Sequence, residues 1–260
     1  MSNSNSVKGG KMRSVVCLDV GNSDIKWAVK KDSEWGKITK HRLDDVHQLP
    51  EVLKKRGISF DHFLVSSVVQ PVQKKLQEMD IAPSSFFADV QQIDNKFLDY
   101  RTPNTLGIDR YLACLGAWKE SNQNSVVVID AGTACTIDLM EANGVYRGGV
   151  IMPGLKLYER GLKRYAKALP QVDRKLPDSY PGKSTEECLK WGITGSFLGA
   201  IGYHLNRMAS KRDNPELYVT GGDADLLTKY GRFEQRLNAD KYLVMKGLLQ
   251  HYLNFHKMAM

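Results

Sequence analysis

The chain has 260 residues, of which 42% are hydrophobic and 25% are charged, the proportions of an ordinary globular protein. No apolar run reaches the roughly 18 to 20 residues that cross a bilayer. The N-terminus lacks the apolar core of a signal peptide, so we expect residues 1–13 to be a disordered leader. These features argue against a membrane protein or a secreted one.

The formal net charge is +8, yet the basic residues are scattered in short pairs such as Lys30-Lys31 and Lys211-Arg212. No zinc finger or RNA-binding motif accompanies them, so we expect no nucleic-acid partner. The excess positive charge instead favours attraction of anionic substrates such as nucleotides. The four cysteines are far apart and lack metal-type spacing, which indicates a reduced, cytoplasmic protein.

The first half of the chain alternates strands and helices. Residues 14–30 predict a strand, a tight turn and a second strand, and residues 35–43 predict a third. A helix over 46–56, a strand over 60–69, a helix from Pro71 and a short strand over 86–90 follow. Because a strand follows Gly21, the turn is neither a Rossmann fingerprint nor a Walker loop, both of which open into a helix.

The second half restarts the same pattern after a helix within 106–120. Strands are expected over 125–130, 135–141, 145–150 and 217–219, with an Asn-Gly hairpin turn at 143–144. Helices are expected over 155–168, over 185–210 and near the C-terminus, with a loop over 170–184. We therefore expect two domains, residues 14–120 and 121–260.

Two strand-turn units repeat 111 residues apart, one ending in Asp19-Val20-Gly21 and the other in Asp130-Ala131-Gly132. Each is a run of β-branched and apolar residues that ends in Asp-x-Gly and a small polar residue. A carboxylate at a strand end, followed by a glycine that exposes backbone N–H groups, suits a metal-bound phosphate. The repeat predicts two similar half-domains that face one nucleotide.

Within each unit, residue types indicate roles. Asp19 is expected to hold Mg²⁺ directly or through water, and Lys26 to neutralise charge beside it. Asp130 is a candidate cation ligand, and Thr133 a donor to phosphate. Asp138 is expected to be a hydrogen-bond anchor for Asp130 or for the turn, since it shares a strand face with Thr136.

Three further elements carry candidate residues. Glycine pairs at 148–149 and 221–222 allow the main chain to lie close to a ligand. In the loop between the two units, Asp109 and Arg110 stand at the start of a helix. Asp109 is a candidate acceptor of a hydroxyl proton, and Arg110 suits bidentate binding of a carboxylate or phosphate.

In this order and spacing, the motifs resemble those of the type III pantothenate kinases, over nearly the whole chain from residue 14. The matching stretches are DVGNSDIK at 19–26, YRTPNTLGIDR at 100–110, DAGTACTID at 130–138, GGVIMPGL at 148–155, STEECLKWGITGSFLGAI at 184–201 and TGGD at 220–223. The resemblance implies an α/β fold of two duplicated ribonuclease H-like (actin-like ATPase) domains with a nucleotide cleft between them. It also implies ATP-dependent phosphorylation of pantothenate, the first step of coenzyme A synthesis.

The resemblance implies a set of site residues, with Asp109 as the catalytic proton acceptor. ATP would be bound by Asp19, Val20, Gly21, Asn22, Ser23, Asp24, Ile25, Lys26 and Thr133. Pantothenate would be bound by Tyr100, Gly107, Ile108, Asp109, Arg110 and Thr185. Besides ATP with Mg²⁺ near Asp19, the resemblance implies a monovalent cation, K⁺ or NH₄⁺, at Asp130, and a homodimer with the substrate site near its interface. Ser23 stands where the family usually has Thr, and Ile108 where it often has Ala.

The sequence is compatible with two alternative functions. One is a kinase of the same superfamily for another small alcohol, because the substrate choice depends on the 100–110 loop and Thr185. The other is a non-enzymatic regulator of gene expression on the same fold, which the intact Asp19, Asp109 and Asp130 argue against.

Overall fold

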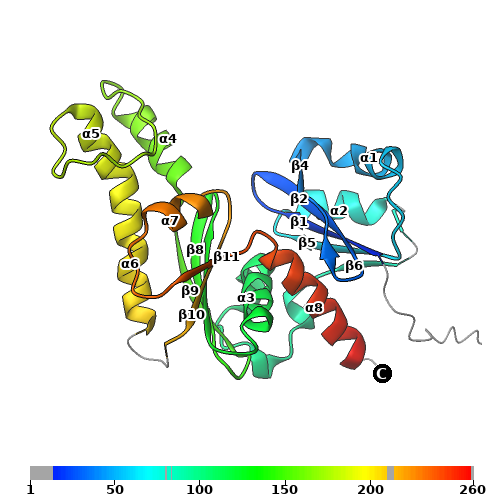
Figure 1. Ribbon diagram of the computed structural model, residues 1–260. Helices are drawn as coiled ribbons and strands as arrows, with labels where there is room; N and C mark the ends of the chain where they lie inside the picture. The colour runs from blue at the N-terminus through cyan, green and yellow to red at the C-terminus, as the bar shows by residue number, and fades with distance from the viewer. Residues whose placement is uncertain (1–13, 80, 83, 210–213, 259–260) are drawn as a thin grey trace, which may run out of the picture. The chain divides into compact units, whose positions relative to one another are not determined.

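The computed structural model describes residues 14–258 except 80, 83 and 210–213. The expected leader over 1–13 and the pair Lys211-Arg212 lie outside the described residues. Packing divides the chain into two compact units, one up to Ala88 and one over Asp89–Met258. Each unit contains one sheet with helices, coloured from blue to red along the chain in Figure 1.

The N-terminal unit is a six-stranded sheet in the order β3-β2-β1-β5-β6, with β4 also paired to β2. Its strands are β1 (Ser14–Val20), β2 (Asp24–Lys31), β3 (Glu34–Trp35), β4 (Thr39–Arg42), β5 (His62–Ser67) and β6 (Ser85–Phe87). Two helices, α1 (Leu49–Lys55) and α2 (Gln70–Glu78), join them, together with the 3₁₀ turn η1 (Leu43–Gln48). Alternate residues of β1, such as Val16 and Leu18, enter the core with Trp27, which leaves Cys17 and Asp19 on the opposite face.

The C-terminal unit is a five-stranded sheet in the order β11-β10-β7-β8-β9. Its strands are β7 (Val126–Ala131), β8 (Ala134–Met140), β9 (Tyr146–Pro153), β10 (Glu216–Thr220) and β11 (Leu237–Ala239). The helices are α3 (Ile108–Glu120), α4 (Leu155–Tyr165), α5 (Thr185–Lys190), α6 (Ser196–Ala209), α7 (Ala224–Tyr230) and α8 (Leu243–Met258). Short 3₁₀ turns are η2 (Val90–Gln92), η3 (Asn95–Phe97) and η4 (Pro103–Thr105), and η5 (Trp191–Gly195) is a π-helical turn that joins α5 to α6.

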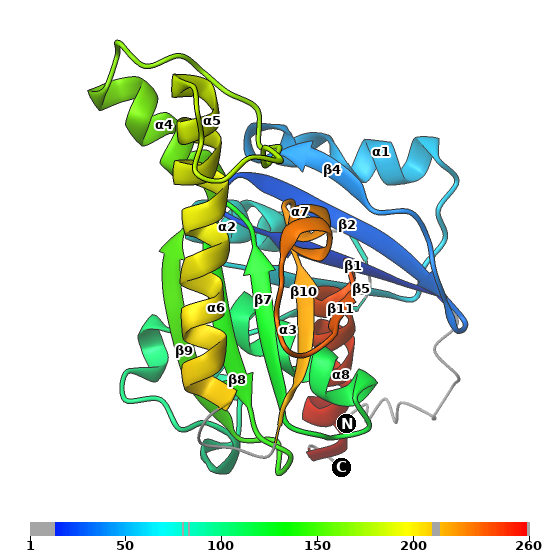
Figure 2. The ribbon, with the colours of Figure 1, turned by 60° about the vertical axis from the view of Figure 1, so that its left-hand side comes forward.

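Helices cover both faces of this second sheet. Alternate residues of β7 and β8, such as Ile129 and Ile137, pack against Phe197 and Ile201 of α6. The other face is covered by α3, which lies against β7, β8 and α8, and Figure 2 shows α6 and α3 on opposite sides of the strands. Glycines allow the α3–α8 contact, because a Cβ at Gly116 would lie 2.2 Å from the Leu243 carbonyl oxygen.

The two sheets share one strand order, which confirms the expected α/β fold of duplicated ribonuclease H-like domains. In the first sheet, β1 pairs antiparallel with β2 and parallel with β5, and β5 pairs parallel with β6. In the second sheet, β7 pairs antiparallel with β8 and parallel with β10, and β10 pairs parallel with β11. The register places Asp19 opposite Lys26 and Ser66, and Asp130 opposite Thr136 and Thr220.

The compact units divide between Ala88 and Asp89, because α3 packs on α8 and β7, and the expected domain boundary at residues 120–121 stays a prediction. Several local elements differ from the sequence expectation. The third strand is broken into β3 and β4 around Gly36, and the expected 185–210 helix contains the π-helical turn. Helix α7 and strand β11 are additional to the expected elements. No helix of the described part of the chain has the length and apolarity needed to cross a membrane.

Candidate functional site

The first Asp-x-Gly turn presents a nearly buried carboxylate. Asp19 is 7% exposed near the end of β1, and the Gly21 N–H donates to the Asp24 carbonyl at 3.1 Å, which closes the hairpin. The Lys26 ammonium lies 4.0 Å from Asp19 Oδ2, where it offsets the carboxylate charge. The predicted partnership of Asp19 and Lys26 is therefore present in the geometry.

The other predicted residues of this turn divide by exposure. Asn22, Ser23 and Asp24 are exposed and offer polar groups at the hairpin tip. Val20 and Ile25 are buried in the apolar core, so only their backbone groups are available to a phosphate. This division follows from the strand alternation on either side of the turn.

Ser66 is a neighbour of Asp19 that belongs to none of the sequence motifs. It lies opposite Asp19 on the parallel strand β5, is fully buried, and its hydroxyl has no hydrogen-bond partner among the described residues. Buried hydroxyls are normally satisfied, which makes Ser66 a candidate contact for whatever binds Asp19. The only sequence signal was the pair Ser66-Ser67 at the end of an apolar strand.

The second Asp-x-Gly turn is enclosed by two close backbone approaches. A Cβ at Gly154 would lie 2.1 Å from the Gly132 carbonyl oxygen, and one at Gly221 would lie 2.5 Å from Asp130 Oδ1. Gly221 has φ +93°, a conformation that other residues rarely adopt. Gly154 and Gly221, from the glycine-rich stretches at 148–154 and 219–224, therefore both lie against the Asp130–Thr133 turn.

The oxygen atoms around Asp130 are of the kind that a hard cation binds. Its carboxylate and the Ala131 carbonyl both lie beside Gly221, and hard cations prefer oxygen ligands. Within the described residues there is no group of three or more His, Cys, Asp or Glu side chains that could hold a metal ion. The expected cations would each rely on one carboxylate, Asp19 or Asp130, with backbone oxygens, water or phosphate completing the shell.

Asp109 and Arg110 begin helix α3, on the face of the sheet that carries Asp130. Asp109 is half-buried, and its Oδ1 accepts the Arg110 N–H at 2.9 Å, which orients the carboxylate. The Arg110 side chain is buried against the sheet and donates to Asp138 from Nε at 3.2 Å and from Nη2 at 2.6 Å. Asp138 also accepts the Tyr146 hydroxyl at 2.8 Å.

Burial and charge act in opposite directions on this buried pair. Burial alone would lower the pKa of Arg110, but its hydrogen bonds to Asp138 and the charge of that carboxylate raise the pKa overall. Burial and the same carboxylate raise the pKa of Tyr146. Arg110 is therefore held charged, and a ligand carboxylate would have to be bound by the N–H groups that Asp138 does not use. Asp138 is a hydrogen-bond anchor as expected, although its partners are Arg110 and Tyr146 and not the turn.

Tyr100 lies beside the same group. Its ring is 6.1 Å from that of Tyr146, and Gly148 (φ +82°) lies so close that a Cβ there would be 3.3 Å from the Tyr100 ring. Gly107 precedes α3 as its N-cap, whereas the Ile108 side chain is 4% exposed and packs inward. Tyr100, Gly107, Asp109 and Arg110 are thus brought together, while Ile108 offers mainly its backbone.

Thr185 is not brought to this group within one chain. It is exposed at the start of α5, in the arm formed by residues 155–190, which comprises α4, the following loop and α5. Both ribbon views show α5 at the end of the unit away from α3 (Figures 1 and 2).

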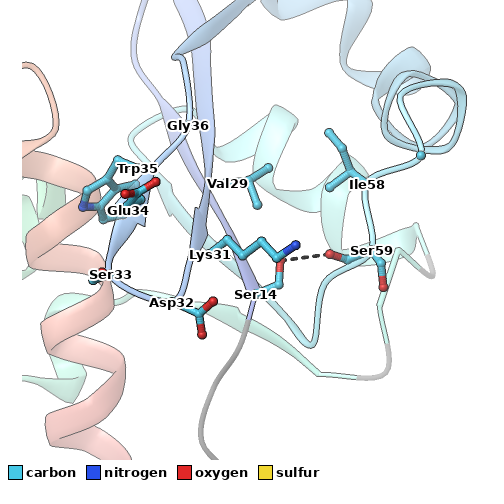
Figure 3. A pocket seen from close by; sticks show the side chains of 11 residues that line it. Ser14, Val29, Lys31, Asp32, Ser33, Glu34, Trp35, Gly36, Ile58 and Ser59 are labelled. Atoms are coloured by element: carbon cyan, nitrogen blue, oxygen red, sulfur yellow. Dashed lines mark hydrogen bonds between the residues drawn. The ribbon is translucent and has the colours of Figure 1, made fainter.

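A pocket of the N-terminal unit lies elsewhere. It is lined by residues from the start of β1, from the β2–β3 hairpin and from the 57–59 loop, including Ser14, Lys31 and Trp35 (Figure 3). The Ser14 hydroxyl there donates to the Ser59 carbonyl at 2.9 Å. None of the predicted site residues lines this pocket, since Asp19 stands near the opposite end of β1.

Comparison with known proteins gives the family. A family model described as type III pantothenate kinase matches residues 15–207. The chain belongs to the type III pantothenate kinase family. A type III pantothenate kinase from Flavobacterium johnsoniae is 32% identical over 248 residues, which cover 92% of this chain and 97% of that protein.

Solved structures agree with the fold. A protein described as a putative Baf family transcriptional activator from Campylobacter jejuni is 25% identical, with a TM-score of 0.60 over 93% of this chain and 99% of that one. MreB5 of Spiroplasma citri, solved with ADP, is 10% identical, with a TM-score of 0.55 over 95% of this pantothenate kinase family member and 98% of that chain. The second likeness supports the actin-like fold alone.

Proposed function

We propose that this chain transfers the terminal phosphoryl group of ATP to the primary hydroxyl of pantothenate, with Asp109 accepting the hydroxyl proton. Family membership makes it a pantothenate kinase, an enzyme of the first step of coenzyme A biosynthesis. The observation that carries the residue assignment is the half-buried Asp109 at the first turn of α3, directly beside the buried Arg110–Asp138 pair.

Phosphoryl transfer asks a protein mainly to align the reacting groups and to stabilise charge. The Arg110–Asp138 pair ties the start of α3 to β8, which fixes the position of Asp109. A general base held in this way removes the proton as the hydroxyl oxygen bonds to phosphorus. Arg110 and Tyr100 would also bind pantothenate, together with Gly107 and the backbone of Ile108.

The ATP-binding part of the proposal uses both Asp-x-Gly turns. Residues 19–26 would bind phosphate oxygens through backbone N–H groups and Ser23, with Mg²⁺ near Asp19. Thr133 would contact ATP, and Asp130 would hold K⁺ or NH₄⁺. The exposed hairpin tip, the nearly buried Asp19 carboxylate and the oxygen donors at Asp130 support these roles.

We also propose a homodimer that forms through the arm. Tyr165 and Tyr180 of the arm are 82% and 79% exposed, and Leu157 and Leu169 of the arm are exposed as well. Several large apolar side chains exposed on one arm favour a protein interface there. Thr185 belongs to the same arm, so dimerisation there would place this predicted substrate contact at the interface. Light scattering of Tyr165→Lys against the wild type tests this, and an unchanged dimer would contradict it.

The cysteines and the basic residues indicate the compartment and the kind of substrate that suit the enzyme. All four cysteines are free, and three of them are buried, which favours a reducing compartment such as the cytoplasm. The scattered basic residues favour small anionic substrates over a nucleic-acid partner.

The test is ADP release with ATP and a panel of alcohols, in wild type and Asp109→Asn. We expect turnover with pantothenate, and a loss of roughly 10²- to 10⁴-fold in the variant with ATP affinity kept. Asp99→Asn, an exposed acid of the same loop that pairs with Arg147, is the matched control and should retain turnover. Near-normal turnover of Asp109→Asn would refute the role of Asp109.

The same assay separates the alternative functions. Faster turnover with another small alcohol would show that this alcohol, and not pantothenate, is the substrate, and the kinase mechanism would be unchanged. The Campylobacter structure is described as a putative transcriptional activator, so absence of ADP release with every alcohol would favour a regulatory role.

A further inference from the structure

One arginine outside all the recognised motifs connects three segments around the second Asp-x-Gly turn. Arg174 lies in the loop between α4 and α5, and its guanidinium donates to both oxygens of Glu159 on α4, through Nε and, at 2.9 Å, through Nη2. Its Nη1 group donates to Asp223, the residue that follows Gly221-Gly222. These partners lie 15 and 49 residues away in the chain.

Both partners belong to segments that touch the Asp130–Thr133 turn. Helix α4 begins after Gly154, whose N–H donates to the Thr133 carbonyl at 3.1 Å. On the other side, Gly221 packs on the Asp130 carboxylate, and the Asp223 N–H donates to the Ala131 carbonyl at 3.0 Å. Arg174 therefore links the two walls that hold the turn.

The loop that carries Arg174 is itself anchored. The hydroxyl of Thr194, a fully buried residue of the π-helical turn η5, donates to the Arg174 carbonyl at 3.2 Å. A π-helical turn interrupts regular helix bonding and is frequently retained at functional sites. A guanidinium so anchored, with its planar fork used by two carboxylates, holds them in one geometry.

The positive charge of Arg174 also acts on its two carboxylate partners. Burial raises the pKa of Asp223, and the neighbouring Arg174 charge opposes that shift. Without the guanidinium, Asp223 and Glu159 would be like charges acting on each other, on segments that touch the turn where triphosphate is also expected. Arg174 offsets this repulsion without standing in the turn itself.

We propose that Arg174 is a positioning residue for ATP: by bridging Glu159 and Asp223, it holds the Thr220–Asp223 segment against the Asp130–Thr133 turn. The inference rests on the proposed ATP site at that turn. Because the bridge acts on the nucleotide side and not on Asp109, its loss should weaken ATP binding much more than it slows turnover at saturating ATP.

The chain offers a matched control in Arg147. Its guanidinium also bridges two carboxylates, those of Glu141 and Asp99, and its side chain is 33% exposed against 32% for Arg174. Arg147 lies at the start of β9, away from the Asp130 turn. A general effect of breaking a two-acid bridge would appear equally in Arg147→Gln and Arg174→Gln.

We would measure ATP affinity by calorimetry, together with KM for ATP and kcat. Arg174→Gln should weaken ATP affinity and raise KM by about tenfold, the loss expected for one charge-assisted hydrogen-bond network, with kcat within about twofold of wild type. Arg174→Lys should recover part of the affinity, and Glu159→Gln should cause a smaller loss because the bond to Asp223 remains. Arg147→Gln should bind ATP as the wild type does.

Equal ATP affinity in wild type and Arg174→Gln would overturn the proposal, as would an equal loss in Arg147→Gln. Should Arg174→Gln fail to fold, Arg174→Lys and Glu159→Gln carry the same test. Wild-type protein that binds ATP without phosphorylating pantothenate would refute the proposed substrate, yet ATP affinity of the variants would still decide the role of Arg174.

Discussion

The buried pair of Arg110 and Asp138 allows a quantitative prediction for Asp138→Leu. The two side chains are 8% and 2% exposed, and the substitution removes two hydrogen bonds from the guanidinium and one from the Tyr146 hydroxyl. Leaving a buried charge without its partner typically costs about 3–5 kcal/mol. For a unit of this size each kcal/mol corresponds to roughly 2–4 °C, so we expect melting of the C-terminal unit to fall by roughly 10 °C.

A double-mutant cycle measured by urea unfolding separates the pair from other effects of the change. Arg110→Met combined with Asp138→Leu removes both charges, so the double variant should be less destabilised than the sum of the single variants by about 3 kcal/mol. Because the pair ties α3 to β8, turnover should also fall in the single variants through displacement of Asp109. A single Asp138→Leu variant within about 1 kcal/mol of wild type, or strictly additive effects, would refute this reasoning.

Three further predictions concern the second turn and the helical layer. Gly221→Ala should weaken ATP binding at least tenfold in calorimetry, because φ is +93° and the new Cβ would meet Asp130. Burial lowers the pKa of His251 from 6.5 to about 4, so the folded state binds a proton there less readily than the unfolded chain does. The free energy of unfolding therefore keeps its full value above pH 6.5, as far as this residue is concerned, and falls as the pH drops from 6.5 toward 4. The free energy of unfolding in urea should be about 2 kcal/mol lower at pH 5 than at pH 7 because of this residue, and His251→Gln should remove that part of the difference. Replacing K⁺ with Na⁺ should lower turnover in wild type, and Asp130→Asn should abolish the difference between the two salts.

Local sequence patterns were sufficient for the fold and for placing Asp19 and Asp130 near the ends of two buried strands. The β-branched runs before Asp19 and Asp130, each ending in Asp-x-Gly, predicted two strands and two turns, and the paired sheets share one strand order. This succeeds because strand periodicity and turn chemistry depend on residues only a few positions apart. The same locality explains why Lys26 was correctly expected beside Asp19.

Other features depended on segments that meet only in the folded chain. Arg110 pairs with Asp138, 28 residues away. Its guanidinium is therefore already bonded to a buried carboxylate, and only its remaining N–H groups are available to bind pantothenate. Likewise Ser66 reaches Asp19 only through the pairing of β5 with β1, and Arg174 reaches Asp223 across 49 residues. The boundary between compact units at Ala88 follows from the packing of α3 on α8, which no local pattern encodes. Side-chain partnerships over such separations are decided by tertiary packing, because the sequence specifies which residues can pair but not which ones the fold brings within reach.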